Sequence, residues 1–205
     1  NLKNIIKFGF NNKNNLIIKN IKVTNKNIKF DLISSLYEPL LDIKSNLLGH
    51  HNAFNVASVC CVLNELGIKL KSNDLISFEG VERRMNTIGS IKSSTFIDDY
   101  AHHPLELDKL ISVLKLFPQK NKFLIIEPHR YSRLNLLYKE YLNVLQNVQN
   151  LLILDTYSAG ESLKKNWKTS KDLVNDLNTI RIKKSLYISN YLDLYNFFDK
   201  KIKES

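Results

Sequence analysis

Segments typical of strands and of helices alternate along the second half of the chain, and this alternation most constrains the fold. Four short apolar runs have strand character, and each precedes a segment of helical character: TFID (95–98), KFLIIE (122–127), LLILD (151–155) and SLYIS (185–189). The helix expected from Pro104 is the clearest, because proline suits the first helical position and an apolar stripe follows at helical spacing. The alternation predicts an α/β fold with a mostly parallel sheet flanked by helices.

The first half of the chain has a different pattern. Three short strand-like runs, IIKFGF, NLIIKNIKV and IKFDLI, are separated by Asn/Lys turns and predict an antiparallel meander or the edge of a sheet. From Asn52 the apolar positions continue without a breaker, which predicts a buried helix closed by Gly67. A shorter helix is expected near residues 73–78. Because the pattern changes around residues 79–82, we expect one domain over residues 1–80 and a second over 81–205.

Composition limits the classes of function. A chain of 205 residues with 43% hydrophobic residues can bury a core. Its formal charge of +10 comes mostly from scattered lysines, which favours a solvated surface over a nucleic-acid interface. No apolar run approaches the roughly 20 residues that span a bilayer, so we expect a cytoplasmic protein with no membrane or nucleic-acid partner. The adjacent Cys60 and Cys61 are expected to be small buried hydrophobic residues.

Arginine and histidine, unlike lysine, are clustered. All five histidines and four of the five arginines fall within four short motifs. In open α/β sheets, ligands bind beyond the carboxyl ends of the strands. Three polar motifs, DDYAHHP, EPHRYSR and DTYSAGE, directly follow predicted strands. We therefore expect them to converge on one edge of the sheet.

The first of these motifs contains residue types that could bind a metal, as in a metal-dependent hydrolase: Asp98, Asp99, His102, His103 and Glu106. Pro104 starts the helix between His102 and Glu106, so the two histidines belong to the loop and lack the spacing of a helical metal motif. An ordinary helix-capping turn is a second alternative. We favour a loop that presents aspartate, tyrosine and histidine to a polar ligand, with no metal ligands.

Two pairs of arginines could bind anions. Arg130 and Arg133 lie three residues apart and could hold one carboxylate or phosphate between their guanidinium groups. Cations are disfavoured at a helix start, which favours an anionic ligand over two solvated arginines. Arg83 and Arg84 could reach a phosphate, although a surface salt bridge fits their pattern almost as well.

The motif GHHNAFN lies at the start of the predicted buried helix. Asn52 and Asn55 share a face, where side-chain amides suit the edge of a purine and the His51 imidazole could stack on it. Asn52 as an ordinary N-cap is the alternative. The loop DTYSAGE, with Glu161, is compatible with a binding edge but is a weak signal alone.

Five stretches in register, GHHNAFN, FEGVERRM, DDYAHHPLE, EPHRYSR and LDTYSAGE, resemble the Mur ligases of peptidoglycan synthesis over about residues 47–161. The ligases that recycle murein tripeptide share a DD-aromatic-AHHP element. PHRYSR and TYSAGE favour instead the members that join L-alanine to UDP-N-acetylmuramate. The resemblance implies a UDP-binding domain, a central ATPase domain and a Rossmann-like C-terminal domain.

The resemblance also implies a reaction and site residues. ATP, with Mg²⁺, phosphorylates the muramoyl carboxylate, and the amine of alanine attacks the acyl phosphate. Adenine would be contacted by His51, Asn52 and Asn55, a phosphate by Arg84 and the ribose by Asp99. The acyl centre and the amino-acid carboxylate would face five residues, the last four of them catalytic: Tyr100, His102, His129, Arg130 and Arg133.

Several family features are not found in these 205 residues. None of the six glycines precedes a lysine, so the Gly-Lys-Thr phosphate loop is not among them. The UDP-binding domain, the magnesium ligands and a last strand and helix are also expected but not found, and Met85 stands where the family usually has phenylalanine. We therefore interpret residues 1–80 as the end of the central domain and 81–205 as a truncated C-terminal domain. Alone, the chain is expected to be inactive and to need the N-terminal part of the ligase.

Overall fold

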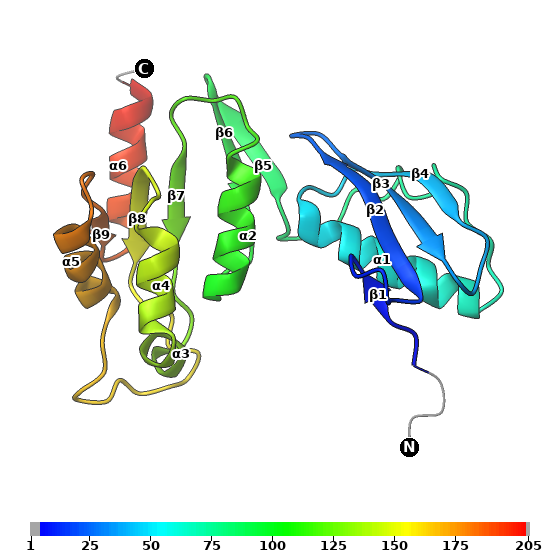
Figure 1. Ribbon diagram of the computed structural model, residues 1–205. Helices are drawn as coiled ribbons and strands as arrows, with labels where there is room; N and C mark the ends of the chain where they lie inside the picture. Colours follow the sequence, from blue (N-terminus) through cyan, green and yellow to red (C-terminus); the bar gives the residue numbers. More distant parts are fainter. Residues whose placement is uncertain (1–4, 204–205) are drawn as a thin grey trace. The chain divides into compact units, whose positions relative to one another are not determined.

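The computed structural model describes residues 5–203, which fall into two compact units divided between Met85 and Asn86 (Figure 1). Each unit has its own hydrophobic core and is described by itself. Among the described residues, no helix has both the length and the apolar character needed to cross a membrane.

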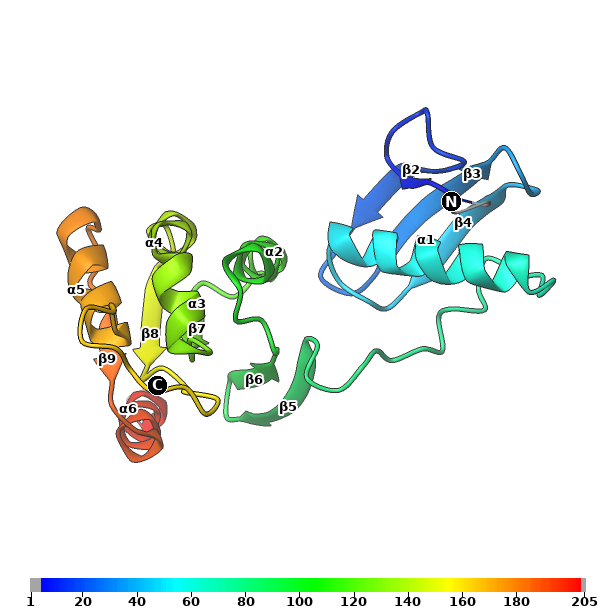
Figure 2. The same ribbon diagram turned by 90° about the horizontal axis from the view of Figure 1, so that it is seen from below.

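The first unit is a small sheet covered on one face by a helix (Figures 1 and 2). Its strands lie in sequence order: β1 (Phe8–Gly9), β2 (Leu16–Val23), β3 (Ile28–Ser34) and β4 (Leu40–Ser45). The predicted antiparallel meander is confirmed for β2 and β3, and β4 continues it as a strand that the sequence pattern did not reveal. For the first run the prediction of antiparallel pairing is wrong, because the short β1 within it pairs parallel to β2. Alternate residues of β3 (Ile28, Phe30 and Leu32) are buried against the helix.

The covering helix α1 (His50–Glu65) confirms the predicted buried helix. It packs through Ala53, Val56, Ala57 and Cys60, and burial raises the pKa of the Cys60 thiol to about 11. Gly67 ends it with a left-handed φ of +74°. The Gly67 N–H donates to the Asn64 carbonyl at 3.0 Å and the Ile68 N–H to the Leu63 carbonyl at 2.8 Å. This is the Schellman arrangement expected of a glycine stop.

The prediction of a short helix near residues 73–78 is wrong, because residues 72–77 form only hydrogen-bonded turns. The Asp74 carboxylate accepts the Lys71 N–H at 2.7 Å, and the Asp74 N–H donates to the Lys71 carbonyl at 3.1 Å. An aspartate that bonds its own local backbone competes with helix propagation.

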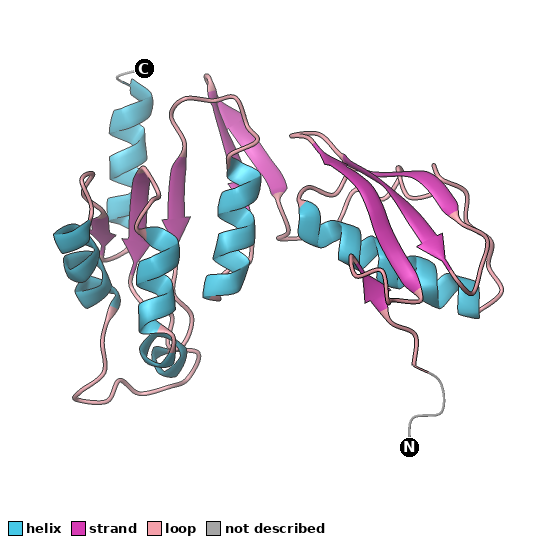
Figure 3. Ribbon diagram, viewed as in Figure 1, coloured by secondary structure: helices cyan, strands magenta, loops and turns pink. Residues whose placement is uncertain are grey.

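The second unit carries the predicted α/β architecture, with helices on both faces of a parallel sheet (Figure 3). Its elements are β5 (Asn86–Ile91), β6 (Ser94–Asp98), α2 (Pro104–Leu114), β7 (Phe123–Ile126), α3 (Tyr131–Leu136), α4 (Tyr138–Leu145), β8 (Asn150–Leu154), α5 (Ser170–Ile180), β9 (Leu186–Ile188) and α6 (Tyr191–Lys203). Strands β7, β8 and β9 pair in parallel. Leu151 and Ile153 of β8 face the core shared with α2, α4 and α5, whereas Leu152 and Leu154 face α6.

One strand of the predicted parallel sheet has a different partner. Strand β6, which contains TFID, pairs antiparallel with β5 and not, among the described residues, with β7. The two strands form a local hairpin whose turn includes Lys92, with a φ of +50°. Phe96 of β6 contacts Phe198 of α6, with ring centroids 6.3 Å apart. Alternation along the sequence predicted a strand here but could not predict that the preceding segment would take its hydrogen bonds.

Candidate functional site

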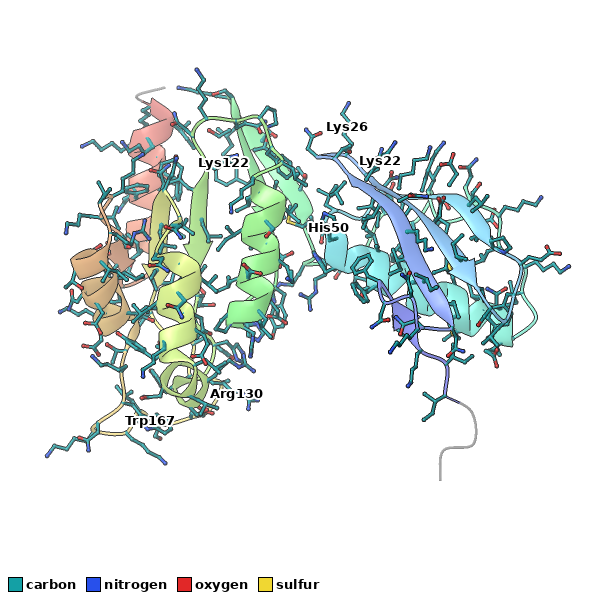
Figure 4. All side chains as sticks on the ribbon, in the orientation of Figure 1. Lys22, Lys26, His50, Lys122, Arg130 and Trp167 are labelled. Atoms are coloured by element: carbon teal, nitrogen blue, oxygen red, sulfur yellow. The ribbon has the colours of Figure 1, made fainter. Side chains whose placement is uncertain are left out.

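The loops that follow β7 and β8 are joined beyond the ends of their strands. The backbone N–H of Arg130 donates to the Tyr157 carbonyl at 2.8 Å, and the Tyr157 N–H donates to the Pro128 carbonyl at 2.8 Å. An isolated parallel bridge between His129 and Tyr157 results. The arrowheads of β7 and β8 point toward this edge in Figure 1, and Arg130 is labelled there in Figure 4.

Four aromatic rings from three loops form a row at this edge. The rings of Tyr100 and His102 meet edge to face with centroids 4.8 Å apart. His102 stacks on His129 at 5.0 Å with an interplanar angle of 29°, and His129 contacts Tyr157 at 5.1 Å. The loop after β6 therefore meets the loops after β7 and β8, although β6 belongs to another sheet.

His102 is held in a defined orientation and tautomer. Its Nδ1 lies 2.9 Å from the Tyr100 carbonyl oxygen, which can only accept, so the proton is on Nδ1 and Nε2 is left as an acceptor. The Tyr141 hydroxyl donates to the His102 carbonyl. Burial lowers the pKa of His102, and the charges of Arg133 and His129 lower it further, against opposing effects of Glu106 and the Tyr100 carbonyl. A neutral imidazole with a free Nε2 can accept a proton from a substrate.

The carboxylates and histidines considered for a metal site shape the backbone of this loop. The Glu106 carboxylate accepts the N–H groups of His102 and His103, each at 3.1 Å. The His103 Nδ1 accepts the Leu105 N–H at 3.2 Å, and the Asp99 carboxylate accepts the Ala101 N–H at 2.8 Å. In residues 5–203, no three His, Cys, Asp or Glu side chains are grouped so that they could hold a metal ion. The structure therefore favours the capping turn over a metal cluster.

The two arginines of EPHRYSR flank the first turn of α3. Arg130 is exposed and precedes the helix with a φ of +72°, a backbone conformation that residues other than glycine rarely adopt. Arg133 is half-buried, and its guanidinium reaches the His129 carbonyl at 3.5 Å. Backbone strain of this kind is concentrated at functional sites in proteins.

Two residues of the loop after β8 belong to this arrangement more clearly than the sequence indicated. Tyr157 extends the row of rings, and Glu161 accepts hydrogen bonds from both the backbone N–H and the hydroxyl of Ser132. These bonds, followed by the charges of Arg130 and Arg133, lower the pKa of Glu161. In the sequence, only the position of Tyr157 and Glu161 after a predicted strand indicated that they belong to the site.

The remaining predicted site residues lie in the first unit. Asn52 is the third residue of α1, not its N-cap, which is Gly49. Its amide donates to the Leu48 carbonyl at 2.7 Å and its carbonyl oxygen accepts from Asn55 at 2.9 Å, so Asn52 orients the exposed Asn55. His51 is half-buried at the same helix start, and Arg84 is exposed after the turn at Val81.

Residues 83–193 match the family model described as Mur ligase, glutamate ligase domain. This match covers more than half of the 205 residues and most of the second unit. The chain belongs to the Mur ligase family. The family predicted from the five motifs is thereby confirmed.

This Mur ligase chain is similar to curated ligases over part of their length. It is 32% identical over 217 residues to the UDP-N-acetylmuramate–L-alanine ligase of Wigglesworthia glossinidia brevipalpis, covering 99% of the chain and 45% of that ligase. To the ligase of the same name from Baumannia cicadellinicola subsp. Homalodisca coagulata it is 35% identical over 172 residues, covering 78% and 35% respectively. The chain thus spans less than half the length of these relatives.

Two solved structures share the fold of this Mur ligase chain. The crystal structure of UDP-N-acetylmuramate-alanine ligase MurC from Thermotoga maritima superposes with a TM-score of 0.72 at 22% identity, covering 92% of this chain and 40% of that one. Mycobacterium tuberculosis folylpolyglutamate synthase superposes with a TM-score of 0.67 at 14% identity, covering 94% and 42%. At these identities the likeness shows the fold, which confirms the predicted α/β class.

Proposed function

We propose that this chain supplies the amino-acid site and part of the ATP site of a ligase that joins L-alanine to UDP-N-acetylmuramate. The names of the curated relatives support this reaction. In this proposal residues 1–80 are the C-terminal part of the central ATPase domain, and residues 81–205 belong to the Rossmann-like C-terminal domain.

One observation carries the proposal. The row of aromatic rings lies beside Arg133 at the carboxyl edge of the parallel sheet. It includes the imidazole of His102, whose lowered pKa favours the neutral form. A proton acceptor next to guanidinium groups suits a zwitterionic amino acid, whose carboxylate needs a cation and whose ammonium must lose a proton before it can attack.

The proposed steps follow from this arrangement. After ATP has phosphorylated the muramoyl carboxylate, Arg130 and Arg133 hold the carboxylate of alanine. The Nε2 of His102 accepts a proton from the alanine ammonium, and the free amine attacks the acyl phosphate carbon. The C–O bond between the acyl carbon and the phosphate breaks, inorganic phosphate leaves, and the nitrogen gives its second proton to the departing phosphate as the amide forms. Tyr100 and His129 enclose the reacting groups and orient the His102 ring.

Candidate nucleotide contacts are proposed within each unit, taken separately. Asn55, oriented by Asn52, would contact the edge of adenine, His51 would stack on it and Arg84 would bind a phosphate. The Asp99 carboxylate would accept a hydrogen bond from a ribose hydroxyl. Mg²⁺ would neutralise the phosphate oxygens when bound. Because the described residues offer no cluster for a metal ion, its ligands are expected in the part of the ligase outside these 205 residues.

A chimera tests the proposal. The portion of the Wigglesworthia ligase that aligns with 99% of this chain would be replaced by the 205 residues. We expect the chimera to form UDP-N-acetylmuramoyl-L-alanine with release of ADP, measured by mass spectrometry and a coupled assay. Arg133→Ala should abolish product formation, whereas Lys109→Ala, on the exposed side of α2, should not. A folded chimera that forms product equally well with Arg133→Ala would contradict the proposal.

The separate chain has its own expected result. Because the phosphate loop is not among the 205 residues, the purified chain should release no ADP in the presence of ATP, L-alanine and UDP-N-acetylmuramate. Release of ADP that depends on both substrates would show that this expectation is wrong.

A further inference from the structure

The geometry points to Glu161 as a positioning residue for the amino-acid site. Its carboxylate supplies the capping hydrogen bond that the N-cap residue of helix α3 does not make. Glu161 thereby holds Arg130 and Arg133 where they can bind one carboxylate together. The identity of that carboxylate, L-alanine, rests on the proposed function. The positioning role itself rests on the contacts of the second unit.

Helix α3 begins without the residue type that normally starts a helix. N-cap positions favour Ser, Thr, Asp and Asn, whose side chains accept one of the unpaired N–H groups of the first turn. In α3 this position is taken by Arg130, which makes no side-chain cap and places a cation at the positive end of the helix dipole. With only six residues, α3 has little intrinsic stability to offset this arrangement.

Glu161 supplies the cap from a distant part of the chain. One carboxylate oxygen accepts the Ser132 backbone N–H at 2.9 Å, and the other accepts the Ser132 hydroxyl at 2.6 Å. Ser132 is the second residue of α3 and lies between the two arginines. A fixed negative charge at this point also offsets the unfavourable contribution of the arginines to the helix dipole.

The loop that carries Glu161 is built to present it. Ala159 and Gly160 both have left-handed φ angles, +50° and +83°, and the Glu161 N–H donates to the Ser158 carbonyl at 3.0 Å. This tight turn reverses the chain toward α3. The same loop accepts the Arg130 N–H through the Tyr157 carbonyl at 2.8 Å. Arg130 is therefore held between two attachment points, one at its own backbone and one at Ser132.

Both oxygens of Glu161 accept hydrogen bonds from Ser132, so Glu161 does not occupy the guanidinium donors of Arg130 and Arg133. A carboxylate that paired directly with these arginines would compete with the substrate. A carboxylate bound to the backbone between them instead fixes their spacing without occupying their donors. This distinction separates a positioning residue from a simple surface ion pair.

Nuclear magnetic resonance of the isotope-labelled chain tests the role. In the wild type, the Ser132 amide and the Arg130 and Arg133 Nε signals should shift together as Glu161 titrates, with a midpoint below the ordinary glutamate value of about 4.3. Glu161→Gln should abolish this shared shift and increase hydrogen exchange of the Ser132 amide by about tenfold or more. Glu140→Gln, on α4, serves as the matched control. Unchanged arginine signals and exchange in Glu161→Gln would overturn the inference.

A second readout uses L-alanine as the probe. Glu161→Gln and Ser132→Ala should each weaken binding about tenfold, and the double variant should be little weaker than either single variant. Equal binding by wild type and Glu161→Gln would overturn the positioning role and leave the proposed function intact. If the wild type binds no L-alanine but shows the shared titration, the proposed function fails and the cap stands. Retention of the remaining amide signals shows that each variant is folded.

Discussion

The imidazole rings of His102 and His129 stack with their centroids 5.0 Å apart, although they come from loops after two strands in different sheets. Protonation of one ring would place a charge against its neighbour and close to Arg133. Together with burial, this arrangement favours the neutral form of His102. In the proposed reaction, His102 is therefore the group suited to accept a proton.

The titration of His102 is the first prediction. The pKa of His102 is lowered in the folded state. Its contribution to the free energy of unfolding is therefore fully present above the unfolded-state pKa of about 6.5 and is lost as the pH falls through the folded-state pKa. The Cε1–H signal of His102 should titrate below about 6.5. In urea unfolding, wild type should lose more stability between pH 7.5 and 5 than His102→Asn. A midpoint above the value of an unstructured histidine peptide would contradict this account.

Substitution of Arg130 separates stability from binding. Its φ of +72° costs a residue with a side chain roughly 1 kcal/mol relative to glycine. The free energy of unfolding of Arg130→Gly should therefore exceed that of Arg130→Ala by about 1 kcal/mol, measured by urea unfolding. Both variants should lose L-alanine binding. If Arg130→Ala were the more stable of the two, or if either variant bound alanine like the wild type, the assigned strain or role would be wrong.

Arg181 is the one arginine outside the polar motifs, and the structure gives it a stabilising role. It is 7% exposed and donates to the carbonyls of Leu145 at 3.0 Å and Lys183 at 3.1 Å, and to that of Val148. Arg181→Met should lower the free energy of unfolding by about 3 kcal/mol, because it leaves buried carbonyl groups without donors. Lys183→Met, at an exposed neighbouring position, should change it by less than about 0.5 kcal/mol. Urea unfolding of the two variants checks this difference.

Two glycines with open space around them provide a matched pair for the end of α1. A Cβ added at Gly67 or at Gly89 would meet no atom within 4 Å, but only Gly67 has a left-handed φ, of +74°. Gly67→Ala should lower the free energy of unfolding by about 1 kcal/mol, and Gly89→Ala should have little effect or stabilise slightly. Equal effects of the two substitutions would contradict the assignment of Gly67 as the helix stop.

The sequence predicted those parts of the fold that depend on local chemistry. Pro104 and the stripe from Leu107 correctly located α2, and the apolar runs correctly located the strands of the parallel sheet. The pairing of β6 was missed because it depends on which segment lies beside β6 in the folded chain, which periodicity does not encode. The contact of Ser132 with Glu161, 29 residues away, was missed for the same reason.

For the candidate site, the sequence predicted which loops would meet but not every contact that joins them. Motif positions after strands predicted that the loops with His129 and Tyr157 would meet, which their hydrogen-bonded bridge shows. The alternative that Asn52 is the N-cap of α1 is wrong, because Gly49 takes that position. The shared helix face of Asn52 and Asn55 was predicted correctly, but the hydrogen bond between their side chains was not.

Titration of the isotope-labelled chain with L-alanine and, separately, with L-alaninamide tests the central claim most directly. We predict saturable shifts of backbone signals in residues 99–103 and 129–133 with L-alanine, and none with L-alaninamide, which has no carboxylate for the arginines. Shifts of equal size with both compounds, or shifts confined to residues away from these loops, would contradict an amino-acid site at the carboxyl edge of the sheet.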